Sequence, residues 1–271
     1  DITLLIATGF HRLTTKEELI FKFGEEIVNN EKIVIHESQK DEDMVYVGKL
    51  PSGGDLLVNK VAYNADLLCS EGFIEPHFFA GFSGGRKSVL PGVASKKTVL
   101  ANHCSKFIDS CKSRTGLIDG NPIHEDMLWA AKACKLAFIC NVVINEKKEV
   151  VYAVSGDLAH RKGVEFLSKY CMVDGLNTDI AISTNGGYPL DQNIYQSVKG
   201  MTAAEATLPE DFKPQVHVNV STNEMKLEVV DNGIGMTEDE LVDYYQSIDL
   251  LVVNIVRKAL GLDIVYVDRD N

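Results

Sequence analysis

The chain has 271 residues, of which 45% are apolar and 24% charged, and its formal net charge is −12. This length suffices for one large domain or two smaller ones, and the composition allows a buried core without disulfides or structural metals. The negative charge argues against partners such as nucleic acid or an anionic membrane surface, and no apolar run approaches the roughly 20 residues of a membrane span.

The six cysteines give no pattern for a metal site or a disulfide framework. None of their spacings matches a close zinc-binding pair such as C-x2-C. Most lie among apolar residues, where a reduced cysteine packs as a small hydrophobic side chain. Together with the lack of a signal-peptide pattern, this favours a cytoplasmic protein. The cysteines are Cys69, Cys104, Cys111, Cys134, Cys140 and Cys171.

The first elements in chain order alternate between strand and helix. An apolar run predicts a strand over 2–9, and 14–28 predicts a helix with a capping box that begins at Thr14 or Thr15. A second strand is expected over 31–38. Because the first strand starts with no preceding turn or cap, we expect the chain to begin inside a larger fold.

The alternation continues through the middle of the chain. Residues 48–65 predict a turn and then a helix, and 66–77 predict a strand that runs into a glycine-rich loop. The later expected elements are helices over 95–111 and 121–134, strands over 136–145 and 149–157 with a turn at 146–149, and a helix over 160–171.

The predicted fold class is α/β, because strands that alternate with helices indicate a largely parallel sheet covered on both faces. We expect a parallel-sheet N-terminal α/β domain, incomplete at its start, over 1–172. The beginning of a second α/β domain follows over 173–206, with Asp191 as a helix cap, and an atypical α+β tail over 207–271. Ligands of such folds bind at the carboxyl ends of strands.

The glycine-rich stretch GFSGGRKS (81–88) is close to the phosphate-binding loop G-x-x-x-x-G-K-[ST]. The second required glycine falls on Arg86, which argues against a nucleoside triphosphatase. The glycines still permit close approach of a ligand. Arg86 is expected to depress the pKa of Lys87 by like-charge repulsion, and a partly neutral lysine is a nucleophile. The alternative is a solvated Lys–Arg pair.

Three histidines lie at or after predicted strand ends: His11, His77 and His103. An imidazole titrates near pH ~6.5, so two facing histidines can serve in turn as acid and base, and a third can bind a metal. The remaining histidines are expected to be packed or surface residues: His36, His124, His160 and His217.

Four segments together resemble the nickel-dependent lactate racemase family: TGFHR, EPHFFAGFSGGRK, the NH at His103, and NGGYPLDQNIYQSVK. The resemblance covers residues 1 to about 206, and its most specific block is EPH-x-x-AGFSGGRK. It implies a racemase or epimerase of a 2-hydroxy acid, with lactate as the default substrate. It also implies that separate cofactor-biosynthesis enzymes act as partners.

The resemblance assigns a role to each matching residue. Lys87 would carry a covalent nickel pyridinium-3,5-bisthiocarboxylic acid mononucleotide, with one arm attached as a thioamide, and His103 would ligate the nickel. His11 and His77 would be the acid–base pair, and Gln196 and Lys199 would bind the substrate. The other implied cofactor-binding residues are Ser83, Gly84, Gly85, Arg86 and Tyr195.

This chemistry explains the residue types. Racemisation breaks a C–H bond of high pKa, and removal of the hydrogen as hydride, while a base takes the hydroxyl proton, avoids a carbanion. The hydride can return to either face of the flat 2-keto acid. Each enantiomer presents its hydroxyl to a different base, so two histidines are needed, while the cofactor accepts the hydride.

The two ends of the chain depart from this family. The family carries an acidic and an arginine contact to the cofactor in a segment that would precede Asp1. At the other end, 216–241 resembles the DNGIGM segment of the Hsp90-type ATPases, in which Asp231, Gly233 and Gly235 would contact adenine. The upstream helix and downstream lid of that family are missing from the sequence pattern, so a glycine turn after a β-pair is the expectation.

Two other functions stay open. GFSGGRKS could bind a phosphate or nucleotide directly in an enzyme without nickel. The chain could also be a non-catalytic remnant or a fused binding protein. Only the racemase requires four residues to converge in space: His11, His77, Lys87 and His103. The oligomeric state is left open.

Overall fold

The structure is a computed structural model, and it divides the chain into two compact units, Asp1–Thr207 and Leu208–Asn271. In the part that the structure describes, no helix is long and apolar enough to cross a membrane. The described residues are 2–156, 158–175, 182–184, 194–207 (side chains from 198) and the backbones of 216–221 and 226–231.

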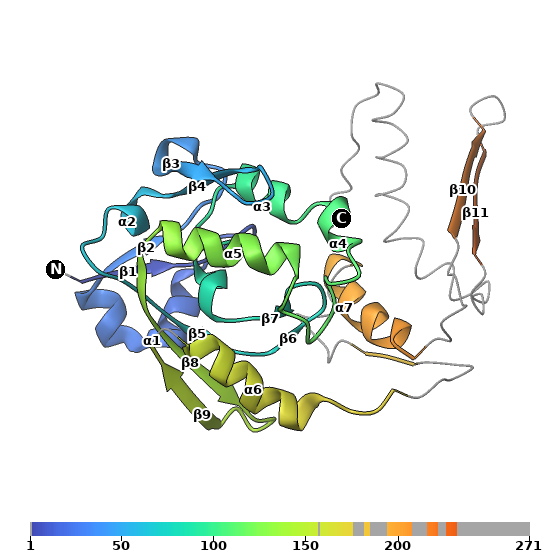
Figure 1. Cartoon of the computed structure of the whole chain (residues 1–271). Helices are drawn as coiled ribbons and strands as arrows, with labels where there is room; N and C mark the ends of the chain where they lie inside the picture. The colour runs from blue at the N-terminus through green and yellow to red at the C-terminus, as the bar shows by residue number, and fades with distance from the viewer. Residues whose placement is uncertain are drawn as a thin grey trace, which may run out of the picture. The chain divides into compact units, whose positions relative to one another are not determined.

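The first unit opens with a β–α–β arrangement (Figure 1). Strands β1 (Thr3–Ile6) and β2 (Lys32–Ile35) pair in parallel, and helix α1 (Lys16–Asn30) connects them. The capping box begins at Thr15, the second of the two predicted positions. The Glu18 N–H donates to Thr15 Oγ1 at 3.3 Å, and Glu18 Oε2 accepts from the Thr15 N–H at 2.8 Å.

The next segment corrects one prediction. After a short 3-10 turn, η1 (Asp41–Asp43), residues 48–65 contribute to an antiparallel hairpin instead of a long helix. Leu56 and Val58 are fully buried on one face of β4, which is the period-two pattern of a strand. The elements are β3 (Met44–Lys49), β4 (Asp55–Asn59) and the one-turn helix α2 (Lys60–Tyr63).

The first unit contains a three-stranded sheet with the strand order β5-β8-β9. Strand β5 (Leu68–Phe73) pairs in parallel with β8 (Leu136–Ile144), and β8 pairs in antiparallel with β9 (Val150–Ser155). The predicted turn at 146–149 is thereby confirmed, and the α/β class with it. The sheet is mixed rather than largely parallel because this turn sends the chain straight back. Helix α6 (Ala159–Cys171) packs on β8 and β9.

The glycine-rich loop lies between β5 and the helices that follow. It contains the short antiparallel pair β6 (Pro76–His77) and β7 (Gly81–Phe82), then the 3-10 turn η2 (Gly85–Ser88). The single helix predicted over 95–111 is broken at His103. The structure has α3 (Lys96–Asn102), which His103 ends with φ −91° and ψ 50°, and α4 (Ser105–Ile108).

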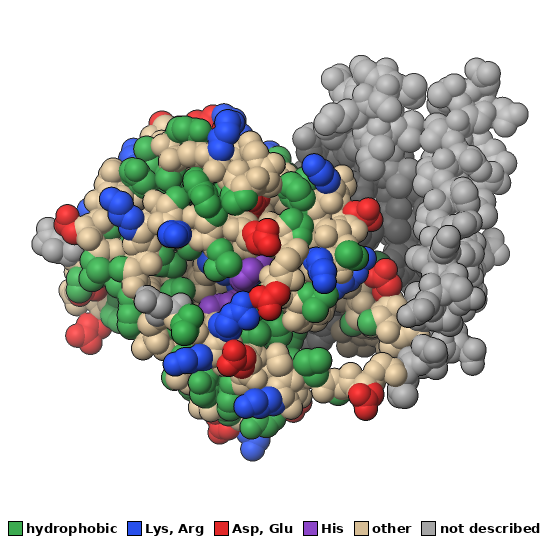
Figure 2. Space-filling view, viewed as in Figure 1, with side chains coloured by type: hydrophobic (Ala, Val, Ile, Leu, Met, Phe, Trp, Pro, Cys, Tyr) green, Lys and Arg blue, Asp and Glu red, His purple; other side chains and the backbone are tan. Residues whose placement is uncertain are grey.

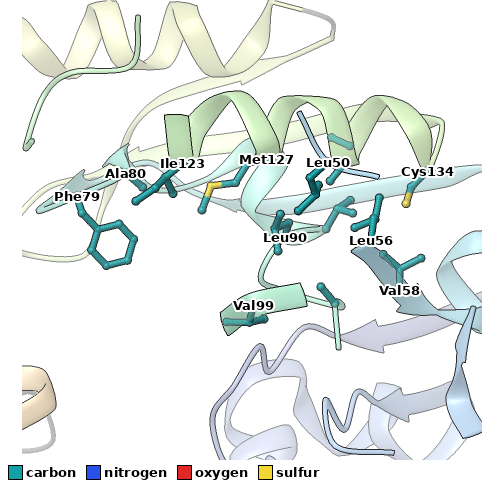
Figure 3. Close-up of a cluster of buried hydrophobic side chains, with 14 residues drawn as sticks. Leu50, Leu56, Val58, Phe79, Ala80, Leu90, Val99, Ile123, Met127 and Cys134 are labelled. Atoms are coloured by element: carbon teal, nitrogen blue, oxygen red, sulfur yellow. The ribbon is translucent and has the colours of Figure 1, made fainter. Parts of the chain in front are cut away.

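The main hydrophobic core lies under helix α5 (Pro122–Ala133), as Figure 3 shows. Ile123 and Met127 of α5 pack there against Leu56 and Leu90, and all four are fully buried. Burial of such a side chain stabilises a fold by about 1.5–3 kcal/mol. Because Leu90 lies two residues after the end of η2, this core anchors the end of the glycine-rich loop.

Asn121 is the residue that joins α5 to this loop. Its Oδ1 accepts from the N–H groups of Ile123 and His124, and its Nδ2 donates to the carbonyl of Phe79 at 2.8 Å. It is fully buried. Replacement of Asn121 by alanine would therefore remove a helix cap and leave the buried carbonyl of Phe79 without this donor.

We expect Asn121→Ala to lower the free energy of unfolding by about 2–4 kcal/mol. Urea denaturation followed by circular dichroism measures this. Asn30→Ala, at the exposed end of α1, is the control and should change stability by less than about 0.5 kcal/mol. Equal effects of the two changes would contradict this role of Asn121.

The first unit ends with α7 (Ile194–Glu205), which is the helix expected within 179–206; the predicted cap Asp191 lies outside the described residues. In the second unit, β10 (Val216–Ser221) and β11 (Lys226–Asp231) form the predicted antiparallel pair. The glycines of the DNGIGM turn also lie outside the described residues, so the resemblance of this tail to an ATPase stays a prediction, as does the division into three parts.

Candidate functional site

Three of the predicted site residues surround the ring of Phe79. The ring centroid of His77 lies 4.5 Å from that of Phe79, and the His103 centroid lies 4.9 Å from it. The Lys87 Nζ lies 5.8 Å from the same centroid. Strand β6, the end of α3 and turn η2 thus bring a histidine, a histidine and a lysine onto one aromatic side chain.

The glycines before Lys87 serve close packing. Gly84 and Gly85 have φ values of 82° and 56°, which residues other than glycine rarely adopt. A Cβ on Gly84 would lie 3.0 Å from the carbonyl oxygen of Phe73, and a Cβ on Gly85 would lie 3.0 Å from the ring of His160. The loop therefore needs glycine at both positions to fold against its neighbours.

Three backbone N–H groups of this loop are already used inside the protein. Ser83 donates to the Glu75 carbonyl at 2.8 Å, Gly85 to Asn141 Oδ1 at 2.9 Å, and Lys87 to the Gly84 carbonyl at 3.2 Å. A phosphate-binding loop needs such groups free to face its ligand. This geometry argues against direct phosphate binding by GFSGGRKS.

Arg86 is buried, with 1% of its surface exposed, so the alternative of a solvated Lys–Arg pair is wrong. Its NH2 donates to the carbonyls of Ala80 and Phe82 at 3.2 and 3.1 Å, and its NH1 donates to the carbonyl of Gly84 at 3.2 Å. Any cofactor contact by Arg86, as predicted, would have to come through its backbone or its Nε–H. The hydroxyl of Ser83 is likewise in use, since it accepts from the Glu75 N–H at 2.8 Å.

The Lys87 amine has the character of a nucleophile. Its pKa is lowered to about 7, first by burial and then by the charges of Arg86 and Lys199. The predicted direction is confirmed, although burial outweighs the repulsion by Arg86. Near neutral pH a large fraction of this amine is unprotonated and can form a covalent bond.

The site histidines are held neutral. Burial, followed by the charge of Lys87, lowers the pKa of His77 to about 2 and that of His103 to about 3. His11 is more exposed, and its pKa is lowered by burial and by the charges of Lys199 and Lys87. The charge of Lys87 therefore acts on all three histidines, and the four residues required to converge share one electrostatic environment.

A cavity of about 400 Å³ opens beside His77. Two of the described residues that line it are charged or ionisable: Lys199 of α7 and Glu75. Burial raises the pKa of the Glu75 carboxyl group, and the charge of Lys199 opposes that rise. The side chains of Tyr195 and Gln196 lie outside the described ones, so their roles stay predictions. The other lining residues include Phe78, Ser83, Thr115, Ser183 and Thr184.

The structure also adds residues that the sequence did not single out. Phe79, Glu75 and Thr115 belong to the site or its cavity. Phe79 and Glu75 lie within EPHFFAGFSGGRK, and this motif was the available signal. Thr115 carries no signal in the sequence, because only the fold brings it to the cavity.

His103 has one feature of a metal ligand. Its Nδ1 is buried and has no hydrogen-bond partner among the described residues, so a lone pair or an N–H is unused there. Among the described residues, no group of three His, Cys, Asp or Glu side chains could hold a metal. Within the described part of the chain, His103 could therefore be only one of several ligands of a metal.

Two more histidines are buried, one in α5 and one in α6. Figure 2 shows histidine side chains near the middle of the viewed face. The rings of His124 and His160 stack with centroids 6.0 Å apart. The pKa of each is lowered to about 3, mainly by burial and then by Arg86. Both are packed, as the sequence predicted for them.

These two histidines predict acid sensitivity. A group whose pKa falls on folding binds its proton more tightly in the unfolded chain, so stability is lost as pH falls from about 6.5 toward 3. Each histidine contributes up to about 1.4 kcal/mol per pH unit in that window. Urea midpoints between pH 7 and 4 test this. A His124→Gln, His160→Gln double variant should show a flatter profile, and a profile as steep as that of the unsubstituted chain would contradict the prediction.

Comparison with known proteins gives consistent results. Residues 1–116 match the lactate racemase N-terminal domain, and residues 173–224 match the lactate racemase C-terminal domain. The chain is 62% identical to a lactate racemase of Lactiplantibacillus plantarum over 211 residues, which is 77% of this chain and 50% of that protein. It is 59% identical to a lactate racemase of Thermoanaerobacterium thermosaccharolyticum over 208 residues, or 76% and 49% of the two chains.

Solved structures agree. The apoprotein of the Thermoanaerobacterium lactate racemase superimposes with a TM-score of 0.74 at 59% identity, over 76% of this chain and 50% of that one. A Thermotoga maritima protein superimposes with a TM-score of 0.54 at 27% identity, over 65% and 48%.

The chain spans about half the length of the curated relatives that it matches. The two matched domain models together cover more than half of this chain. The segments that they cover include those that hold His11, His77, Lys87, His103 and Lys199. By sequence and by fold, the chain belongs to the lactate racemase family.

Proposed function

We propose that the chain takes part in the racemisation of a 2-hydroxy acid, with lactate as the first substrate to test. The observation that carries this proposal is the cluster of His77, His103 and Lys87 around Phe79, beside a cavity that Lys199 lines. The names of the relatives support lactate as the substrate. Because the chain covers half of those relatives, the activity of the whole protein is part of the proposal.

The cofactor in this proposal is a nickel-pincer nucleotide attached to Lys87. A buried amine with a pKa of about 7 suits the tether, and the unpartnered Nδ1 of buried His103 suits the nickel. When bound, the cofactor supplies a hydride acceptor next to C2 of the substrate. Enzymes that make the cofactor are then required partners.

The chain's own residues bind the substrate and move its proton. Lys199 faces the cavity and would hold the substrate carboxylate. His77 and His11 would take the hydroxyl proton, each from one enantiomer. Nδ1 of His77 accepts from the Ala80 N–H at 3.2 Å, and in that tautomer Nε2 carries the proton and can only donate to the substrate. A lone pair at Nε2 requires a proton on Nδ1, so that tautomer gives up this long hydrogen bond.

Attachment at Lys87 would also change the charges around the histidines. The lysine charge is the second cause, after burial, of the low pKa of both His77 and His103. A thioamide carries no positive charge, so tethering removes this one cause of the low pKa of His77 and His103. The pyridinium ring and the nickel of the cofactor would bring positive charges of their own, so burial and those charges would keep both histidines neutral.

The phosphate-binding alternative has less support, because the N–H groups of Ser83, Gly85 and Lys87 are bonded within the protein. The non-catalytic alternative has the same fold and differs only in the absence of cofactor and turnover. An assay of the loaded protein separates it from the racemase.

The test is racemisation of lactate deuterated at C2, using the chain expressed with nickel and cofactor-making enzymes. Hydride transfer keeps the deuterium in the product of opposite configuration, whereas a carbanion would lose it to water. We expect conversion with retained label. Conversion with label washed out would overturn the hydride mechanism, and no conversion by cofactor-loaded protein would overturn the proposed function.

A further inference from the structure

Arg86 is a buried cation that has no carboxylate partner among the residues that the structure describes. Its guanidinium reaches the carbonyls of Ala80, Phe82 and Gly84. A buried charge is costly unless it is paired or well hydrogen-bonded. Neutral acceptors therefore hold this charge in place.

The one side chain among these acceptors is His160 of α6. Its Nε2 lies 2.7 Å from Arg86 NH1 and 2.8 Å from the carbonyl oxygen of Ser83. A guanidinium can only donate, so Nε2 bonds to Arg86 only in the neutral tautomer whose proton is on Nδ1. In this tautomer Nε2 has no proton, so it bonds to Arg86 and makes only a close contact with the Ser83 carbonyl. The ring also covers Gly85 closely enough to exclude a Cβ there.

The nature of this partner matters for Lys87. An aspartate or glutamate in the place of His160 would satisfy Arg86 but cancel most of its charge. A neutral imidazole satisfies the guanidinium and leaves its full charge next to the following residue. The field of Arg86 then favours the unprotonated amine of Lys87, which is the form that bonds covalently.

We propose that His160 is a positioning residue: its neutral ring holds the Arg86 guanidinium beside Lys87 without cancelling the guanidinium's charge. This inference rests on the proposed function, because it explains how the tether lysine stays reactive. It assigns to His160 a role toward Lys87, although α6 lies more than 70 residues further along the chain.

The proposal is tested with variants at residue 160, and these variants leave the other charged groups near Lys87 and His160 unchanged. Those that act on Lys87 or on which Lys87 acts are Arg86, Lys199, His11, His77, His103 and His160. Those that act on His160 are Arg86, Arg161 and Lys87, with the Ser83 carbonyl opposing them and His124 stacked on its ring. A change at residue 160 decides whether a negative charge lies beside Arg86, and it leaves the charges of the other groups as they are.

The experiment measures the reactivity of Lys87 in the full chain without cofactor. The chain is labelled briefly with acetic anhydride between pH 5 and 10, and acetylation of the Lys87 peptide is quantified by mass spectrometry. His160→Glu places a carboxylate beside Arg86, and we expect the labelling midpoint of Lys87 to rise by about one pH unit, with labelling at pH 7 reduced about fivefold or more. His160→Gln, which can accept from Arg86 and donate to Ser83, should stay within twofold of the unsubstituted chain.

His124→Gln is the matched control, because His124 is also buried but its Nδ1 has no partner; it should leave the profile unchanged. If His160→Glu does not fold, His160→Leu keeps the test: hydrogen exchange of amides 83–88 should speed up at least tenfold over His160→Gln. A Lys87 profile that His160→Glu leaves unchanged in folded protein, or equal exchange in the Leu and Gln variants, would overturn the inference. Because no cofactor or turnover is involved, failure of the racemase assay does not affect these outcomes.

Discussion

Replacing His77 with Gln is expected to slow lactate racemisation by about 10²–10⁴-fold, because it removes the group that takes the hydroxyl proton from one enantiomer. His11→Gln should have a similar effect through the other enantiomer. Steady-state racemisation falls in both directions in each case, since every cycle needs both histidines. The rates are measured with the cofactor-loaded chain, starting from each pure enantiomer.

The two variants should differ in their half-reactions. With one histidine left, the loaded protein can still convert one enantiomer to pyruvate on the enzyme. Acid quenching of single-turnover mixtures should therefore release pyruvate from one enantiomer with His77→Gln and from the opposite one with His11→Gln. His124→Gln is the control and should retain racemisation. Pyruvate from the same enantiomer in both variants would contradict the two-base assignment.

The second large effect concerns the metal. We expect His103→Ala to lower the nickel content of the loaded chain from about one equivalent to near zero, while the adduct on Lys87 remains. The buried Nδ1 of His103 has no partner in the part of the chain that the structure describes, so the substitution removes a candidate ligand at little cost in hydrogen bonding. Inductively coupled plasma mass spectrometry measures nickel, and intact mass measures the adduct.

Lys87→Arg is the comparison for that experiment. It keeps a positive charge but cannot form the thioamide, so we expect both nickel and adduct to be lost. Cys104→Ser, next to His103, is a further control that should keep both. Full nickel content in the His103→Ala protein would show that the metal is held elsewhere.

The sequence was most informative about the site where one motif carried several roles. EPHFFAGFSGGRK contains His77, Lys87 and the unforeseen Phe79, and local spacing alone brings these residues near one another. The low pKa of Lys87 was also foreseeable from Arg86. Its main cause was not, because burial depends on how the turn η2 packs against α5, β5 and β8.

Contacts between distant segments lay beyond sequence reasoning. His160 looks like an ordinary helical histidine until the fold brings it 2.7 Å from Arg86. Similarly, LLVNKVAYNA has the residues of a helix, yet Leu56 and Val58 are drawn into a strand because that arrangement buries both in the core. The break at His103 follows from the same competition, since the local helical preference yields to the packing of its ring on Phe79.

The central claim is that Lys87 carries a covalent nucleotide cofactor within a site shared with His77 and His103. The most direct test is the intact mass of the denatured chain, after expression with nickel and the cofactor-making enzymes, beside the Lys87→Arg variant. We predict an added mass of nucleotide size on the unsubstituted chain and none on the variant. An unmodified mass for the unsubstituted chain, or the same adduct on both proteins, would contradict the claim.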